Sequence, residues 1–149
     1  IIGPGADNLQ VSDYSQKKAG ERSSSVLKGI QTTASKSTRV IYEKGCEFFN
    51  EEYFDEEAAV KAAKNSDVVV MVLGDCSNSD GGSKENVQTS GENHDLATLV
   101  LPGYQQELLE AVCATGKPVI LVLQTGRPYK LSIAAENCKA MSLNGFPGS

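Results

Sequence analysis

The fold of this chain is constrained most strongly by two continuous apolar runs, DVVVMVL at residues 67–73 and VILVL at residues 119–123. Neither run alternates apolar with polar residues, and such runs are typical of parallel strands buried on both faces of a sheet. A helical pattern at residues 103–114 separates the two runs, and another at residues 55–65 precedes the first. This alternation predicts an α/β fold, a three-layer sandwich with a mostly parallel sheet and helices on both faces.

Weaker patterns predict further elements of the same fold. They indicate a strand end at residues 1–3, strands at 38–43 and 138–143, and short helices near 24–30 and 132–136. The turn Gly3-Pro4-Gly5 has two interpretations. A Gly-x-Gly after a strand begins a dinucleotide fingerprint, but the position of its third glycine holds Asn8 and no helix opens at once. We favour a tight turn, with a nucleotide site as the alternative.

The composition argues against two classes of partner. The net charge is −5 and the only adjacent basic residues are Lys17 and Lys18, so the chain has no basic stripe for nucleic acid. No run approaches the roughly 20 apolar residues of a transmembrane helix, so no membrane partner is expected. The chain begins at IIGPGADN without an initiator Met and ends in NGFPGS. We therefore expect residues 1–149 to be one domain cut from a longer polypeptide.

The cysteines do not form a metal-binding pattern. None of the four belongs to a C-x-x-C pair, and the chain has a single histidine, so we expect neither a metal nor a cofactor. Cys113 and Cys138 fall in apolar elements and are predicted to be small core residues, while Cys46 and Cys76 are predicted to lie in loops. Four thiols slightly favour a reducing compartment such as the cytoplasm, and secreted and periplasmic locations stay open.

The longest connection, residues 75–103, contains the main candidate for chemistry. Strand-to-helix links usually take about 2–6 residues, and loops this long are mostly functional or disordered. Glu92 follows Gly91 in this loop. Partial burial in a cleft raises the pKa of a carboxyl group, which is what a general acid near neutral pH needs. The alternative is a solvated loop glutamate. We expect His94 to form hydrogen bonds within the loop, and Asp95 to accept backbone N–H groups and shape it.

Ser90 and Arg127 also have side chains that are capable of chemistry. Ser90 is not predicted to be a nucleophile, because Thr89-Ser90-Gly91 does not match the G-x-S-x-G elbow. Arg127, in the GRPY segment after the second apolar run, is suited to an anionic or hydroxyl-rich ligand or to a structural ion pair.

Motifs along nearly the whole chain resemble the second, α/β-sandwich domain of glycoside hydrolase family 3, the β-glucosidase family. In chain order the matching segments are IIGPGADN, SDYS, VLKGI, Tyr42 with KGC, SDVVVMVLGD, TSGE, LPGYQQELLEAV, GKPVILVLQTGRPY and FPG. Single segments are short, but all of them in this order are specific to the family.

The resemblance implies the acid/base-contributing domain of a retaining β-glycosidase. The family's acid/base glutamate lies in an S-G-E motif, here Ser90-Gly91-Glu92, and the nucleophile belongs to an N-terminal barrel. Asp95 keeps the family's aspartate, so Ser90, Gly91 and Asp95 are predicted to scaffold the loop. The arginine that commonly follows is replaced by Leu96.

The resemblance also implies the partners. They are a β-linked oligosaccharide or an aryl or alkyl glycoside, and the barrel domain of the same polypeptide. Ser12 and Asp13 resemble a segment that reaches toward the sugar and are predicted to bind substrate. The isolated chain is expected to be inactive. The alternative is a non-catalytic carbohydrate-binding or interdomain module.

Overall fold

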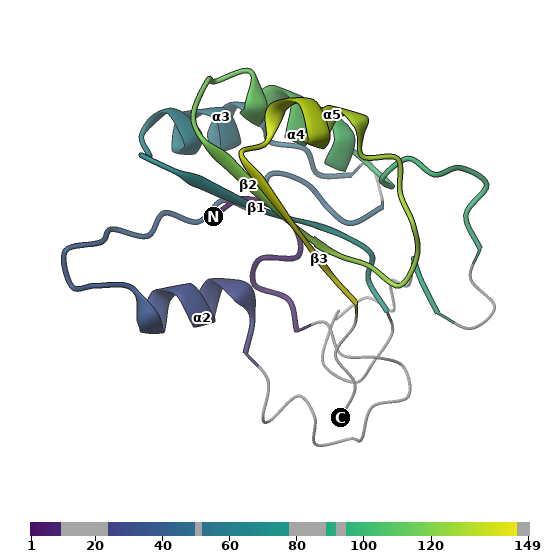
Figure 1. Cartoon of the computed structure of the whole chain (residues 1–149), viewed down its shortest axis with the longest axis horizontal. Helices are drawn as coiled ribbons and strands as arrows, with labels where there is room; N and C mark the ends of the chain where they lie inside the picture. Colours follow the sequence, from purple (N-terminus) through teal and green to yellow (C-terminus); the bar gives the residue numbers. More distant parts are fainter. Residues whose placement is uncertain (10–23, 50–51, 78–88, 92–94, 146–149) are drawn as a thin grey trace.

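The computed structural model describes residues 1–9, 24–49, 52–77, 89–91 and 95–145. Its centre is a parallel sheet of three strands in the order β1 (Val69–Gly74), β2 (Val119–Gln124) and β3 (Ala140–Asn144) (Figure 1). The register aligns Val69 with Val119 and Ile120 with Ala140. These strands confirm the parallel sheet that the apolar runs predict.

The sheet extends beyond β1 only through isolated bridges. Ile2 pairs in parallel with both Met71 and Glu43. The strand predicted at residues 38–43 is therefore wrong, since Glu43 is its only paired residue. The reason lies in the partner segment. Glu43 donates its N–H to the Ile1 carbonyl and accepts the Gly3 N–H, and in this parallel register residues 38–41 lie opposite no described strand.

Helices cover both faces of this sheet. α3 (Glu56–Lys64), α4 (Gln105–Cys113) and α5 (Ser132–Asn137) lie on one side, and α2 (Val26–Thr33) lies on the other (Figure 1). Side-chain caps begin two of them: Ser25 accepts the Lys28 N–H at 3.2 Å, and Asp55 accepts the Ala58 N–H at 2.9 Å. The α/β sandwich predicted from the sequence is confirmed.

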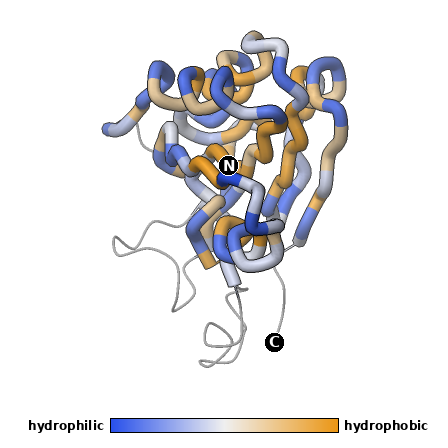
Figure 2. Tube along the Cα trace, turned by 90° about the vertical axis from the view of Figure 1, so that its left-hand side faces the viewer, coloured by the Kyte–Doolittle hydropathy of each residue, from blue (hydrophilic) through white to orange (hydrophobic). Residues whose placement is uncertain are grey.

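The alternation of side chains along β1 divides the core into two layers. Val69, Met71 and Leu73 pack with residues of α3, α4 and α5, whereas Val72 packs with Leu27 of α2. Successive residues of a strand point to opposite faces, so a continuous apolar run serves both layers. β1 and β2 contribute most of the buried strand residues, whereas β3 is exposed along its length. Hydrophobic segments run through the middle of the molecule in Figure 2.

The cysteines differ from their predicted burial. Cys46 and Cys76 lie outside helices and strands, as predicted, but both are completely buried. Cys113 and Cys138 are only half-buried and pack at the edge of the core. Burial raises the pKa of both Cys46 and Cys113 to about 12. None of the four cysteines forms a disulfide. Within the described part of the chain, no helix is long and apolar enough to cross a membrane.

Candidate functional site

The carboxyl ends of the three strands form one edge of the sheet. Gly74, Gln124 and Asn144 end β1, β2 and β3 and are aligned side by side in the register. The connections that leave this edge begin with the polar residues Asp75 and Thr125. Ligand sites of open parallel sheets form outside this edge, so the residues found there make up the candidate site.

Asp75 is a completely buried carboxylate at the end of β1. Its Oδ2 accepts a hydrogen bond from Thr125 Oγ1 at 2.7 Å and lies 3.9 Å from Arg127 Nε. Its Oδ1 accepts a hydrogen bond from the Tyr129 hydroxyl and a longer one, at 3.4 Å, from Thr89 Oγ1. Because a buried charge is costly unless it is paired and hydrogen-bonded, these contacts explain how the carboxylate is accommodated.

Tyr129 is a donor in this network at neutral pH. Burial raises the pKa of its hydroxyl group, and the hydrogen bond to Asp75 and the negative charge of Asp75 raise the pKa further, against the lowering effect of Arg127. The phenol therefore stays protonated and does not act as a base. Arg127 pairs with the buried Asp75, which agrees with the structural alternative for this residue.

The β1 loop returns to the sheet edge at Thr89 and Ser90. The Thr89 N–H donates to the Cys76 carbonyl at 2.8 Å, and the Ser90 N–H donates to the same oxygen at 3.2 Å. In return, the Cys76 N–H donates to Thr89 Oγ1 at 2.8 Å. Thr89 and Ser90 are both 5% exposed. The two residues before Gly91 are thus bonded to Cys76, which lies two residues after the end of β1.

A buried glutamine joins the same strand end to α4. The Gln105 Oε1 atom accepts the Gly74 N–H at 2.7 Å, and its Nε2 atom donates to the Gly74 carbonyl at 2.9 Å and the Phe48 carbonyl at 2.7 Å. Gln105 is completely buried. This one side chain satisfies backbone groups that a strand end would otherwise leave without partners.

Glycine is required where the chains approach each other closely. At Gly74 φ is 134°, and a Cβ atom there would lie 1.9 Å from the Gln124 carbonyl oxygen. At Gly3 a Cβ atom would lie 2.2 Å from the Val72 carbonyl oxygen. The Gly5 N–H donates to that same oxygen at 3.2 Å. The glycines at Gly3 and Gly5 thus pack a turn against β1, as the favoured interpretation predicts.

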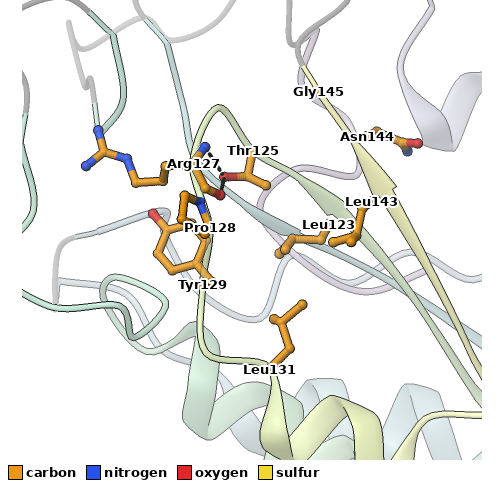
Figure 3. Close-up of a pocket in the computed structure, with 9 residues that line it drawn as sticks. All are labelled: Leu123, Thr125, Arg127, Pro128, Tyr129, Leu131, Leu143, Asn144 and Gly145. Carbon is orange, nitrogen blue, oxygen red and sulfur yellow. Dashed lines mark hydrogen bonds between the residues drawn. The ribbon is translucent and has the colours of Figure 1, made fainter.

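A pocket of about 260 Å³ lies beside the Asp75 network at the ends of β2 and β3. Leu123, Leu131 and Leu143 point into it in Figure 3, while the Arg127 side chain extends away from them. The other lining residues are Thr125, Pro128, Tyr129, Asn144 and Gly145. Among the described residues, no carboxylate lines this pocket.

The structure describes only part of the predicted site. Ser90 is buried, Gly91 is exposed with φ at 128°, and the Asp95 side chain is exposed. Their scaffold role stays a prediction. The other predicted site residues lie outside the described residues: Glu92, His94, Ser12 and Asp13. No group of three or more His, Cys, Asp or Glu residues within the described ranges is arranged to hold a metal ion.

Sequence reasoning missed the residues that organise this edge. Asp75, Thr125, Tyr129 and Gln105 carry the side-chain network, and none was predicted as a site residue. A signal was available, because Asp75 and Thr125 are polar residues that directly follow the two strongest strands. Parallel strands end at the same edge of a sheet, so the two were candidates for contact.

Three comparisons connect this geometry to known proteins. A model of the glycosyl hydrolase family 3 C-terminal domain matches residues 1–149. A β-xylosidase of Formosa agariphila is 39% identical over 99% of this chain, and a periplasmic β-glucosidase of Salmonella typhimurium is 28% identical over all of it. A solved β-glucosidase structure from Erythrobacter marinus matches 99% of the chain at 29% identity with a TM-score of 0.75.

These relatives are much longer than the chain. The matched region is 20% of the β-xylosidase, 21% of the periplasmic β-glucosidase and 22% of the Erythrobacter marinus structure. The chain thus spans about a fifth of the length of these relatives.

Proposed function

Because this chain belongs to the glycosyl hydrolase family 3 C-terminal domain, we propose that it supplies the catalytic acid/base of a retaining β-glycosidase. The relatives are named as β-xylosidases and β-glucosidases, which supports a substrate with a terminal β-linked sugar. Since the chain spans about a fifth of their length, the proposal assigns the nucleophile and most of the sugar contacts to the barrel domain of the same polypeptide.

One observation supports the assignment of the acid role to a particular residue. The backbone of Thr89 and Ser90 is bonded to Cys76 at the carboxyl edge of the sheet, and Glu92 follows two residues after Ser90 in the sequence. A general acid must be held within hydrogen-bond reach of the oxygen that it protonates. A fixed attachment just before the glutamate supports Glu92 as that acid.

The chemistry assigns two steps to this carboxyl group. Glu92 as an acid protonates the glycosidic oxygen while the nucleophile attacks the anomeric carbon, forming a glycosyl-enzyme. Glu92 as a carboxylate then takes a proton from the water that hydrolyses this intermediate. In retaining enzymes the two carboxyl groups stand about 5–5.5 Å apart, so the barrel must bring its nucleophile to this edge of the domain.

The test uses Glu92→Ala in the full-length enzyme. We expect kcat/KM for alkyl and other poorly activated glycosides to fall by about 10²–10⁴-fold, because these leaving groups need a proton. Dinitrophenyl glycosides need none, so their first step persists, and added azide accelerates turnover by attacking the glycosyl-enzyme in place of activated water. Glu85→Ala changes a second glutamate of the same loop and is the matched control.

Two results oppose the proposal. An equal loss with all leaving groups and no effect of azide contradicts an acid/base role of Glu92. A full-length protein that binds sugar, hydrolyses no glycoside and is indifferent to Glu92→Gln is a non-catalytic module.

A further inference from the structure

We propose that Thr89 is a positioning residue for the Glu92 carboxyl group. The inference rests on the proposed acid/base role of Glu92 and adds the residue that holds its end of the loop. It starts from the contacts of Thr89 itself, which lies three positions before Glu92 in the sequence.

Thr89 is attached to the end of β1 through both its backbone and its side chain. Its N–H donates to the Cys76 carbonyl, and its Oγ1 accepts the Cys76 N–H, both at 2.8 Å. The backbone bond is available to any residue except proline, but the side-chain bond needs a hydroxyl group or another acceptor at this position. Without that acceptor, the buried Cys76 N–H loses this hydrogen bond, and an intramolecular hydrogen bond contributes about 0.5–1.5 kcal/mol to stability.

The hydroxyl proton of Thr89 has two acceptors within reach. Asp75 Oδ1 and the Cys76 carbonyl oxygen each lie 3.4 Å from Oγ1. The Cys76 carbonyl already accepts the N–H groups of Thr89 and Ser90. Hydrogen bonds to an ionised carboxylate are stronger than those between neutral groups, so the proton is better placed toward Asp75.

Asp75 is itself immobilised from the opposite side. Its backbone N–H donates to the Gln124 carbonyl at 2.8 Å, and its carboxylate accepts from Thr125 and Tyr129. The carboxylate is completely buried and faces Arg127. Thr89 is thus connected to a charge that the β2 connection holds in place, and not to a mobile surface group.

This attachment limits where Glu92 can lie. An extended chain covers at most about 3.3–3.6 Å per residue, so a fixed Thr89 keeps the residue three positions later within roughly 10 Å of the sheet edge in the proposed arrangement. Catalysis is sensitive to such placement, since a displacement of about 1 Å can cost about 100-fold in rate. Gly91, with φ at 128°, lies between the anchor and the acid.

The experiment compares Thr89→Val with Thr125→Val in the full-length enzyme. Each variant exchanges one hydroxyl group that donates to Asp75 for a methyl group of the same size. Only Thr89 is close to Glu92 in the sequence, three positions before it. We expect Thr89→Val to lower kcat/KM for alkyl glycosides at least 10-fold and for dinitrophenyl glycosides less than 3-fold. Thr125→Val should lower both to the same extent. Thr89→Ser keeps the hydroxyl group and should restore the alkyl glycosides to within about 3-fold of wild type.

Each outcome separates the inference from the proposed function. Equal losses of Thr89→Val on both substrates, or the same pattern in Thr125→Val, overturn the positioning role. If Glu92→Ala depends on the leaving group and Thr89→Val does not, the inference fails alone. If Glu92→Ala shows no such dependence, the proposed function fails first. Thr89→Ala, which leaves room for a water molecule, is scored by the same criteria if Thr89→Val does not fold.

Discussion

The carboxylate of Asp75 accepts a hydrogen bond of 2.7 Å from the hydroxyl group of Thr125, and this bond joins the connections that follow β1 and β2. Asp75 is buried, and the bond spans 50 positions of the sequence. It links the part of the sheet edge that leads to the connection of residues 75–103 with the part that carries Arg127 and Tyr129. The stability of this edge is therefore expected to depend on Asp75.

Replacing Asp75 by alanine should destabilise the domain by about 3 kcal/mol, because it removes the buried carboxylate that accepts from Thr125 and Tyr129 and faces the charge of Arg127. Calorimetric unfolding of the full-length enzyme measures the effect. Asp67→Ala is the matched control, since Asp67 lies just before the other end of β1 and is exposed. Similar transition temperatures for the two variants would contradict the role of the Asp75 network.

Replacing Gly74 by alanine should also destabilise the domain, by about 3 kcal/mol or more, through backbone strain and overpacking. The added Cβ atom meets the Gln124 carbonyl oxygen at 1.9 Å, where neither strand can give way. Gly29→Ala, in α2, is the control because its Cβ atom meets nothing within 4 Å. That variant should be neutral or stabilising by about 0.5–1 kcal/mol, as alanine favours helix. A tolerated Gly74→Ala would show that the strand ends are less closely packed than described.

The contribution of the Tyr129 hydroxyl group to stability should depend on pH. The pKa of this hydroxyl group is raised in the folded domain by burial, by its hydrogen bond to Asp75 and by the charge of Asp75. Its contribution is therefore complete below the unfolded pKa of about 10 and is lost as the pH rises above that value. In thermal unfolding of the full-length enzyme at about pH 8, the transition temperature of the wild type should be higher than that of Tyr129→Phe. This difference in transition temperature should shrink above about pH 10.

Tyr104→Phe is the control for this pH series, because Tyr104 stacks on Phe54 and lies outside the Asp75 network. A difference between wild type and Tyr129→Phe that stays constant across the whole series would argue against the hydrogen bond as the cause.

Much of the fold is predictable from local patterns. The runs at residues 67–73 and 119–123 became β1 and β2, and the helical patterns at 55–65 and 103–114 became α3 and α4. These elements have a strong periodicity that reflects burial directly. The strand prediction for residues 38–43 was wrong, because a β-branched composition does not specify which strand a segment pairs with. Only Glu43 forms a bridge.

The candidate site divides in the same way. The length of the loop and its S-G-E motif single out Glu92 as the candidate acid. The side chains that support the loop were not apparent, since a buried aspartate and an exposed one look alike in a sequence. Gln105 reads as a polar residue early in a helix, yet it is completely buried against Gly74.

The amino-acid sequence by itself determined the parallel α/β architecture and the glycosidase family, because hydrophobic periodicity and ordered motifs are properties of short segments. Only the tertiary structure decided what surrounds Asp75. Its partners Thr89, Thr125 and Tyr129 lie 14, 50 and 54 positions away, and they meet because parallel strands end at one edge of the sheet. A local pattern marks Asp75 and Thr125 only as polar residues that follow two strands. It does not specify the complete set of contacts, which forms because a buried charge must be paired and hydrogen-bonded.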